Sequence, residues 1–400
     1  MRLSIETRAL HATMLAMRTT EILVVGGGCV GLASAIELAG RGSKVTLLER
    51  GLVGAANSSH HGGGIRQQFG TELNIELAKL SAATWDDFEA RFGVDPLFRR
   101  IGYLFLARTA EGASMLAEHV RLQRGLGVDS EWLDAEEIAR RWPVLEGRGF
   151  AGGGFRAGDG WANQHRIVEG FARGATEAGV QVLLGTEALT LEATGGRVTG
   201  VRSSGGPIAA DAVLIATGPW ISQLLGPLGL DLPVEGRRHE LLLVEPTEPL
   251  PADLPWLIAV EDAVHVRSDD PPHAQIGGFL GEDVAVDPDR YEPWVDADWT
   301  RMVLDAAARI FGVVGPESRV HRGWAGLYPT TPDRHPIIDR LTDGLYAAVG
   351  FAGTGVMLAP GAGVLVSELI QEGAIRSANA AELAASRFGP ERGTAETTGF

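Results

Sequence analysis

Three glycines near the start of the chain have the spacing of a phosphate-binding loop. Gly26, Gly28 and Gly31 form a G-x-G-x-x-G pattern, and Glu49 stands 18 residues after the last of them. The first glycine permits a tight turn, the second lets the backbone approach a diphosphate, and the third lets the following helix pack on a sheet. An acid at this place binds an adenosine ribose, whereas an arginine would favour a 2′-phosphate. The spacing therefore predicts a site for FAD or NAD rather than NADP.

The residues around this loop predict the elements that would position it. The runs 22–25 and 45–48 are short and apolar, which is typical of buried parallel strands, and 32–39 has apolar residues at helical spacing. Gly40 and Gly42 end that helix. The glycine pattern alone would be weak evidence, but a pattern bracketed by two strands strongly predicts a dinucleotide-binding βαβ unit.

The composition excludes several classes of protein. The 400 residues are 45% hydrophobic and 22% charged, which is enough for about two domains with substantial cores. A net charge of −16 argues against nucleic acid and anionic membrane surfaces as partners. Cys29 is the only cysteine, so no intrachain disulfide can form, and we expect a cytoplasmic protein. The sequence has no run long enough for a membrane span, and it lacks H-x-x-x-H and C-x-x-C spacings, so no metal site is expected.

The order of the predicted elements indicates two interleaved domains. The buried run 212–216 predicts a strand that returns to the nucleotide-binding sheet late in the chain, so that domain must be discontinuous. Strand-rich segments between 235 and 279 are separated by proline-rich turns, which favours an antiparallel sheet. We therefore expect an α/β fold with a Rossmann-like dinucleotide-binding domain and a substrate domain that has a mainly antiparallel sheet. The expected ranges are 21–95, 150–225 and 320–375 for the first domain, 96–149 and 226–319 for the second, 1–20 for a flexible leader without a signal peptide, and 376–400 for a loose tail.

Periodicity and turn signals predict the other elements. Further helices are expected at 71–91, 113–124, 167–178, 299–311 and 362–371, with another that opens at 133–137 and ends at Pro143. Further strands are expected at 101–107, 180–184, 188–193, 198–202 and 344–349. The run Gly158-Asp159-Gly160 predicts a turn.

Several separated segments together resemble the glycine/sarcosine/D-amino-acid oxidase superfamily of FAD enzymes. They occur in the order of that family and span nearly the whole chain. The similarity is greatest to the sarcosine oxidase group, which includes the monomeric enzyme and the β subunit of the heterotetrameric form. The segments are VVGGGCVGLASAIELAGRG at 24–42 with Glu49, SSHHGGGIRQQF at 58–69, IATGPW at 215–220, YPTTPDRHPIID at 328–339 and GLYAAVGFAGTGVMLAPGAG at 344–363.

The resemblance implies an FAD that extends across the first domain, with its ring at the boundary between the domains. The residues implied at the diphosphate and adenosine are Gly26, Gly28, Cys29, Val30, Gly31, Glu49, Arg50 and Ala188. Those implied beside the ribityl chain and ring are Ser58, Ser59, His60, His61, Gly63, Gly64, Gly218, Trp220, Gly353, Thr354, Gly355, Val356 and Met357.

The same resemblance implies residues that contact a substrate. Arg66 matches the arginine that holds the substrate carboxylate in sarcosine oxidases, and a planar guanidinium suits a carboxylate. His239 and His265 lie on predicted strands that cover the flavin face in this family, and strand alternation puts Arg267 on the same face as His265. A purely structural role stays open for each of these candidate residues. The candidate catalytic residues are Arg66, His61, His239, His265, Arg267 and Tyr328.

The sequence also departs from the family pattern. Gly326 stands where monomeric sarcosine oxidases attach FAD to a cysteine, and Cys29 lies in the phosphate loop, so we expect a noncovalent FAD. Gln275 replaces the lysine that activates oxygen, and without that charge the negative oxygen species loses its main stabiliser. We therefore expect the reduced protein to react slowly with oxygen, as a dehydrogenase does. An oxidase stays possible, because another cation could stabilise the negative oxygen species in place of the lysine. Met357 replaces a second carboxylate-binding lysine, and Thr354 replaces a histidine.

The sequence predicts an FAD-dependent oxidoreductase that removes a hydride from a carbon beside nitrogen. The expected substrate is a secondary amine or amino acid, such as a sarcosine-like, N-substituted or D-amino acid, and water would hydrolyse the imine product. Two alternatives stay open: an FAD-dependent 2-hydroxy-acid dehydrogenase, and a non-catalytic or electron-relay flavoprotein subunit of a complex. The electron acceptor, either oxygen or another redox carrier, stays open too, as does the presence of an oligomer or a partner subunit.

Overall fold

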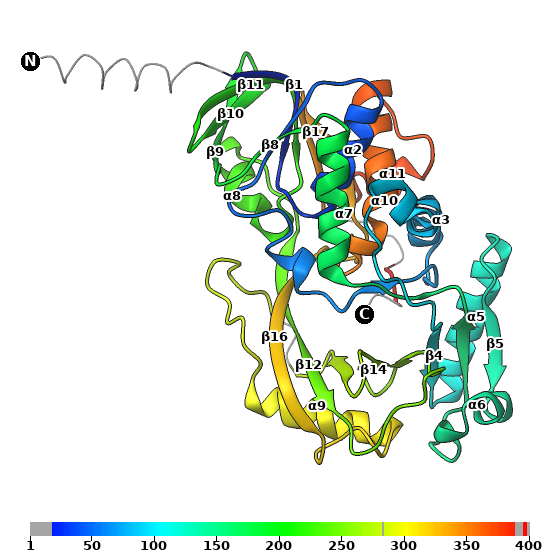
Figure 1. The fold of residues 1–400 in the computed structure, drawn as a ribbon. Helices are drawn as coiled ribbons and strands as arrows, with labels where there is room; N and C mark the ends of the chain where they lie inside the picture. Colours follow the sequence, from blue (N-terminus) through cyan, green and yellow to red (C-terminus); the bar gives the residue numbers. More distant parts are fainter. Residues whose placement is uncertain (1–17, 282–283, 389–394, 398–400) are drawn as a thin grey trace, which may run out of the picture.

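The computed structural model describes residues 18–281, 284–388 and 395–397. Two eight-stranded sheets form the upper and lower parts of the molecule in Figure 1. A short two-stranded sheet, β3 (Gly64–Ile65) with β7 (Gly160–Trp161), accompanies them. No helix in the described ranges is long and apolar enough to cross a membrane.

The upper sheet is built on five parallel strands whose residues are mostly buried. Such burial explains why these strands are short apolar runs without polar alternation. Antiparallel β17 lies beside β18, and β10 pairs with both β11 and β9. In sheet order the strands are β17 (Ile337–Thr342), β18 (Leu345–Val349), β11 (Gly206–Ile215), β1 (Arg18–Val25), β2 (Val45–Leu48) and β8 (Gln181–Leu183), with β10 (Arg197–Ser203) and β9 (Ala188–Thr194) alongside.

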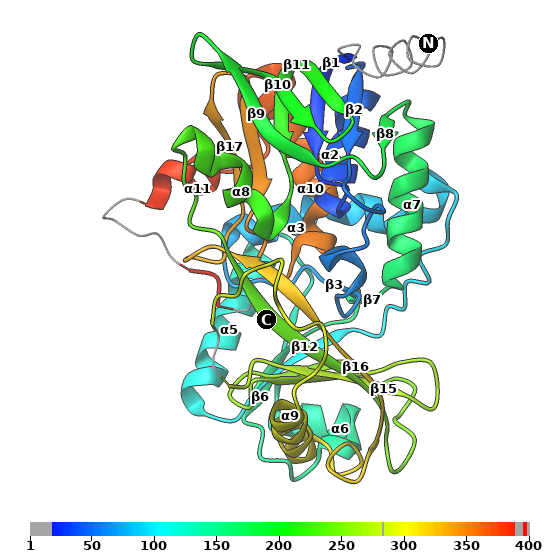
Figure 2. The ribbon, with the colours of Figure 1, turned by 90° about the vertical axis from the view of Figure 1, so that its left-hand side faces the viewer.

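Helices cover one face of the upper sheet and share a single hydrophobic core with it (Figure 1). The other face packs against α8 (Ile221–Leu225) and the β9–β10 hairpin (Figure 2). The helices on the first face are α2 (Cys29–Gly40), α3 (Glu72–Asp86), α4 (Phe88–Phe92), α7 (Gln164–Glu177) and α10 (Gly355–Ser367).

The lower sheet is antiparallel except where β13 lies parallel to β4. Its strands in order are β16 (Arg319–Thr330), β12 (Glu235–Glu245), β15 (Ala274–Gly278), β14 (Val264–Ser268), β13 (Trp256–Ala259), β4 (Tyr103–Ala107), β6 (Gly152–Arg156) and β5 (Glu131–Asp134). Helices α9 (Ala297–Ile310) and α6 (Ala135–Arg141) contribute to the core on one face, and α5 (Ala110–Gly125) contributes to a second, smaller cluster. The long strands β12 and β16 extend upward to the first sheet (Figure 1).

The α/β fold, with a discontinuous Rossmann-like unit and a mainly antiparallel second sheet, is confirmed. The domain ranges differ in detail from the sheets. Strand β6 pairs with β4 and β5, and β16 pairs with β12, so both belong to the lower sheet although boundaries at 150 and 320 would assign them to the first domain.

The ends of the chain also differ from the expected ranges. Residues 18–20 are not part of a leader, because they pair with 208–210 in β1 and β11; the rest of that predicted leader, 1–17, lies outside the described residues. The segment expected as a loose tail contains α11 (Ala380–Leu383), whose Leu383 is fully buried. Farther on, Glu396 is 2% exposed.

Candidate active site

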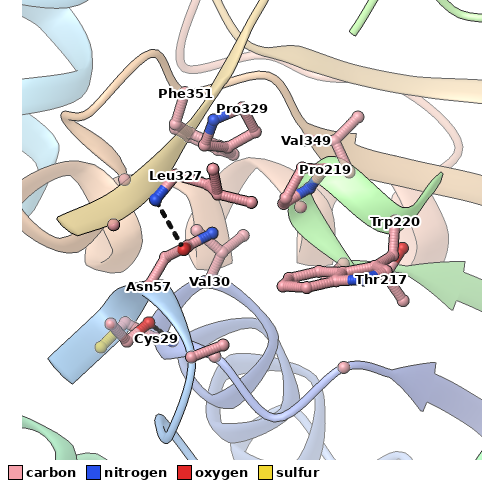
Figure 3. Close-up of a pocket in the computed structure, with 18 of the residues that line it drawn as sticks. Cys29, Val30, Asn57, Thr217, Pro219, Trp220, Leu327, Pro329, Val349 and Phe351 are labelled. Atoms are coloured by element: carbon pink, nitrogen blue, oxygen red, sulfur yellow. Dashed lines mark hydrogen bonds between the residues drawn. The ribbon is translucent and has the colours of Figure 1, made fainter. Parts of the chain in front are cut away.

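A cavity lies at the carboxyl ends of the parallel strands, where ligands bind in open α/β sheets. The loop between β1 and α2 forms one wall, the segments after β11 and β18 form others, and strands β12 and β16 of the lower sheet complete it. Figure 3 shows Asn57 between Cys29 of α2 and Leu327 of β16, and the Leu327 N–H donates to Asn57 Oδ1 at 3.1 Å. The predicted cofactor residues that line this cavity are Gly26, Gly28, Cys29, Val30, Glu49, Arg50, Ser58, His60, His61, Ala188, Gly218, Trp220, Gly353, Gly355 and Val356.

The glycine loop has the geometry that its spacing predicts. Gly26 has a φ of +109°, and a Cβ there would lie 2.5 Å from the carbonyl oxygen of Ala216. A Cβ on Gly31 would lie 2.0 Å from the carbonyl oxygen of Gly26, so the loop and α2 can approach this closely only with glycine. The Glu49 carboxylate accepts hydrogen bonds from the Gly27 and Gly51 amides at 2.8 and 2.7 Å, which fixes it at the cavity wall.

Cys29 is not a reactive thiol. Its side chain is buried, and burial raises the pKa of the thiol to about 12. The Cys29 amide donates to Ser58 Oγ at 3.1 Å, which ties the phosphate-binding loop to the following loop. Cys29 therefore lines the cavity as a neutral, small apolar residue.

A loop of the lower half contacts one wall of the cavity from outside its lining. Asp289 accepts hydrogen bonds from Trp220 Nε1 and Gln223 Nε2, both at 2.7 Å. It also pairs with Arg50 at 3.4 Å, and the Arg50 guanidinium lies 4.4 Å from the Trp220 ring centre. Because Arg50, Trp220 and Gln223 all line the cavity, Asp289 fixes three of its wall residues.

A smaller cavity adjoins the first one, and the two share His61, His265, Tyr328 and other wall residues. Tyr328 packs against His239, with ring centres 4.1 Å apart, and His239 lines the larger cavity. Most of the smaller cavity's remaining wall is apolar or aromatic. The lining residues are His61, Gly62, Gly64, Arg66, Tyr103, Phe105, Leu241, Trp256, Ile258, His265, Tyr328, Gly353, Val356 and Met357.

Arg66 is the cation of this smaller cavity. Its side chain is 5% exposed and lies 4.2 Å from the ring centre of Phe69 and 5.3 Å from that of Phe105. Nη1 donates to the carbonyl of Gln68. Burial lowers the pKa of the guanidinium, but an arginine still remains charged near neutral pH. A buried cation that lines an apolar cavity is suited to an anionic group of a ligand.

His61 and His265 are neutral hydrogen-bond donors where the two cavities meet. Burial, with a smaller effect of Arg267, lowers the pKa of each histidine to about 3. His61 Nδ1 accepts from the Gly63 amide at 2.9 Å, and His265 Nδ1 accepts from Trp256 Nε1 at 3.3 Å. A neutral histidine with an acceptor Nδ1 must carry its proton on Nε2.

Arg267 does not line either cavity, although the sequence places it among the catalytic candidates. Its guanidinium lies 3.9 Å from the Trp161 ring centre and forms an ion pair with Asp269 at 3.0 Å. Its Nε donates to Gln275 Oε1 at 3.2 Å, and Gln275 does not line either cavity. These contacts make Arg267 a buried support behind the wall.

Of the predicted cofactor residues, Gly31, Ser59, Gly63 and Thr354 also stand outside both linings, whereas Gly64 and Met357 line the smaller cavity.

The aromatic wall of the smaller cavity is what sequence reasoning missed. Tyr103 and Trp256 stack with ring centres 4.9 Å apart, and both are buried. They meet because β4 and β13 pair in parallel, with Tyr103 opposite Trp256. Alternation along the predicted strand 101–107 indicates that Tyr103 and Phe105 share a face, but it does not show which distant strand lies beside them.

A comparison with protein families identifies the chain. The family described as FAD dependent oxidoreductase (DAO) matches residues 21–369. The chain belongs to this family. Among curated DAO-family relatives, it is 28% identical to a glycine oxidase of Geobacillus kaustophilus over 88% of this chain and 93% of that one. It is 25% identical to a sarcosine oxidase subunit beta of Arthrobacter sp. over 91% of this chain and 90% of that one.

Solved structures agree with the DAO-family fold. The L-proline dehydrogenase from P. horikoshii matches with a TM-score of 0.85 and 28% identity, over 93% of this chain and 98% of that one. The glycine oxidase from Geobacillus kaustophilus matches with a TM-score of 0.80 and 26% identity, over 93% of this chain and 99% of that one.

The larger cavity fits the FAD of the DAO family. Thr217 Oγ1 and His61 Nε2 are buried, belong to residues that line it, and have no hydrogen-bond partner within the described part of the chain. Buried polar atoms are normally paired, so these two groups suit a ligand with its own donors and acceptors. The first turn of α2 adds backbone N–H groups and a positive dipole end for a diphosphate. FAD supplies hydride acceptance, and the residues above would hold it.

Proposed function

We propose that this protein oxidises the C–N bond of a small amino acid or N-substituted amino acid, with Arg66 holding the substrate carboxylate. One observation carries the proposal: a buried arginine lines a small apolar cavity that joins the cofactor cavity. A carboxylate bound to Arg66 would keep the α-carbon on the flavin side of the cavity. The protein then contributes mainly orientation and exclusion of water.

The reaction removes a hydride from the α-carbon and leaves a C=N double bond. The nitrogen lone pair would form the new π bond, hydride acceptance is the chemistry that bound FAD would supply, and water would later hydrolyse the imine to a carbonyl compound and an amine. The nitrogen must therefore be unprotonated. His61 and His265 are poor bases because burial lowers their pKa values to about 3, so we expect the amine to lose its proton before hydride transfer.

The same two histidines favour an amine over a 2-hydroxy acid. An alcohol must give up its hydroxyl proton as hydride leaves, which requires a base close to the carbon. Burial raises the pKa of Tyr328 to about 12 and that of Tyr103 well above its usual value, so neither phenol is ionised near neutral pH. The lining of the smaller cavity thus contains no strong base for an alcohol, whereas an amine can arrive already neutral.

The walls of the smaller cavity favour a compact apolar substituent on the substrate. Leu241, Trp256, Ile258 and Met357 line it together with Phe105. None of these five side chains offers a charge to a polar substituent. We therefore expect small aliphatic or cyclic amino acids to bind better than acidic or basic ones.

Anaerobic titration tests this proposal. Purified protein should be yellow, and a small N-alkyl or cyclic amino acid should bleach the flavin absorbance near about 450 nm. The matching 2-hydroxy acid should leave that absorbance unchanged. Bleaching by the hydroxy acid alone would instead support the hydroxy-acid dehydrogenase, and bleaching by neither compound would support an electron-relay subunit.

We further propose that the reduced protein reacts slowly with oxygen and passes electrons to another carrier. The cation nearest to Gln275, Arg267, is paired with Asp269 and lies behind the wall. Admission of air after the titration tests this point, because reoxidation within milliseconds would make the protein an oxidase.

The single cysteine supports a cytoplasmic location, and a partner subunit that carries the electrons would appear as a co-purifying chain.

A further inference from the structure

The loop that carries Arg66 is held at both ends by buried carboxylates. On one side Asp159, which is 1% exposed, contacts Gln67 and Gln68. On the other side Glu396, which is 2% exposed, contacts Gly70 and Thr71. Neither carboxylate lines a cavity, so neither is placed to contact the substrate.

Asp159 fixes the residues directly after Arg66. Its Oδ1 accepts from the Gln67 amide at 3.0 Å, and its Oδ2 accepts from Gln68 Nε2 at 3.3 Å. The Gln68 side chain also donates to the Tyr103 carbonyl at 3.1 Å. Since Arg66 Nη1 donates to the Gln68 carbonyl, this network reaches the guanidinium through a single residue.

Glu396 fixes the end of the loop from a point distant in sequence. Its Oε1 accepts from the Gly70 amide at 2.9 Å. Its Oε2 accepts from the Thr71 amide at 3.2 Å, the Thr71 hydroxyl at 2.8 Å and Asn74 Nδ2 at 3.1 Å. The Glu396 amide donates to the Asp333 carbonyl at 3.0 Å, so the described residues 395–397 are themselves anchored.

The two carboxylates also act on Arg66 electrostatically. Burial lowers the pKa of the Arg66 guanidinium, and the negative charges of Glu396 and Asp159 oppose that shift. A carboxylate in such a place is costly unless it is paired or hydrogen-bonded; both carboxylates accept hydrogen bonds from the loop, and Asp159 also forms an ion pair with Arg156 at 2.5 Å. A loop that needed only to be folded could use backbone contacts alone, so the buried charges indicate a demand for accurate placement of Arg66.

We propose that Asp159 and Glu396 are positioning residues that set the affinity of the site for carboxylates by holding the Arg66 loop from both ends. This inference rests on the proposed function, in which Arg66 binds the substrate carboxylate. It gives Glu396, which is distant from the loop in sequence, a role in substrate recognition. The Gly158-Asp159-Gly160 turn acquires the same role.

Acetate and acetamide are the probes, because they have similar shape and differ in charge. Their dissociation constants are measured from the change that each causes in the flavin spectrum of the full-length holoprotein. Wild-type protein should bind acetate more tightly than acetamide. Glu396→Gln and Asp159→Asn should each weaken acetate binding by roughly tenfold, as loss of hydrogen bonds to a charged group does, and leave acetamide binding unchanged.

Matched substitutions and a double-variant cycle separate positioning from general destabilisation. Glu146→Gln and Asp298→Asn make the same changes at exposed carboxylates and should leave both dissociation constants unchanged. In an Arg66→Ala background, Glu396→Gln and Asp159→Asn should have no further effect on acetate, because they act through Arg66. Thr71→Val removes the hydroxyl that donates to Glu396 and that also lies 2.9 Å from His335 Nε2, while the Thr71 amide still donates to Glu396, so it should weaken acetate binding only a few-fold.

The outcomes are distinct. If wild-type protein does not prefer acetate to acetamide, the proposed function fails. A second outcome is that wild-type protein prefers acetate but the variants behave like the two controls. If acetate binds equally well to Thr71→Val, Glu396→Gln and Asp159→Asn, the proposed function survives and the positioning role is overturned. An equal loss for acetate and acetamide would also overturn it, because the carboxylates would then support only the fold.

Discussion

At the scale of single residues, the proposed chemistry depends on the shape of Arg66 as much as on its charge. The guanidinium lies against Phe69 and Phe105, which a planar group can do and an ammonium cannot do equally well. We expect Arg66→Lys to lower kcat/KM for an amino acid by roughly 30-fold or more, mainly through KM, because a desolvated charge pair is disturbed. Steady-state kinetics with a carboxylate-free amine is the control. Equal losses for both substrates would assign Arg66 a structural role.

The buried histidines make a second prediction, which concerns stability against pH. Their folded-state pKa of about 3 lies below the unfolded value of about 6.5, so only the unfolded state gains their protons as the pH falls from 6.5 toward 3. The free energy of unfolding should therefore decrease as the pH is lowered from 6.5 toward 3, by up to about 1.4 kcal/mol per pH unit for each histidine. His61→Asn and His265→Asn should each flatten this dependence in thermal melts. Parallel curves for all variants would contradict the neutral state of these two rings.

At the scale of elements, the turn before α10 depends on a glycine. Gly353 has a φ of +85°, and a Cβ there would lie 2.3 Å from the ring of Tyr328. Gly373 has a similar φ of +80°, but a Cβ there would meet nothing within 4 Å. Gly373→Ala therefore measures backbone strain alone, of about 1 kcal/mol. Gly353→Ala should be more destabilising and should also reduce bound FAD, as thermal melts and the flavin absorbance of the purified protein can show. Equal effects would mean that the Tyr328 contact is unimportant.

Elements whose signals are local could be predicted from the sequence. The strand at 45–48 was predicted at its observed bounds, and the glycine loop follows from spacing alone. Helix α10 instead begins at Gly355, ahead of the expected start at residue 362, and contains Pro360 and Gly361. A Cβ on Gly361 would lie 2.5 Å from the Leu77 carbonyl oxygen, so α10 uses its glycines to approach α3 closely. Such tertiary packing outweighs helix propensity and has no local signature.

At the scale of the whole molecule, the candidate site is built from segments that only the fold brings together. Most of the cofactor residues that the family resemblance implies line the larger cavity, because its motifs are contiguous runs of sequence. The wall of Tyr103 and Trp256 requires the pairing of β4 with β13, and the contact of Glu396 with Thr71 requires residues 395–397 to lie beside the start of α3. Contacts of this kind depend on topology, which periodicity does not contain.

The Asp289 loop gives a prediction at this largest scale, because it reaches from the lower half to the cofactor cavity in the upper half. The ion pair of Asp289 with Arg50 is half exposed and should contribute little to the retention of FAD. We therefore assign most of the effect of Asp289 to its hydrogen bonds with Trp220 and Gln223. Asp289→Ala should release these wall residues and speed the loss of FAD by roughly tenfold, with little change in substrate affinity.

The measurement is the rate of flavin release on dilution, followed by fluorescence. Asp270→Ala removes an exposed aspartate of the lower half that pairs with Arg99 and does not line the cavity, so it should release FAD at the wild-type rate. High salt weakens exposed ion pairs but leaves neutral donors in place. The wild-type rate should therefore respond only slightly to salt if Trp220 and Gln223 carry the effect. A strong salt dependence would instead assign the effect to Arg50, and an unchanged rate in Asp289→Ala would show that the two halves retain the cofactor without this loop.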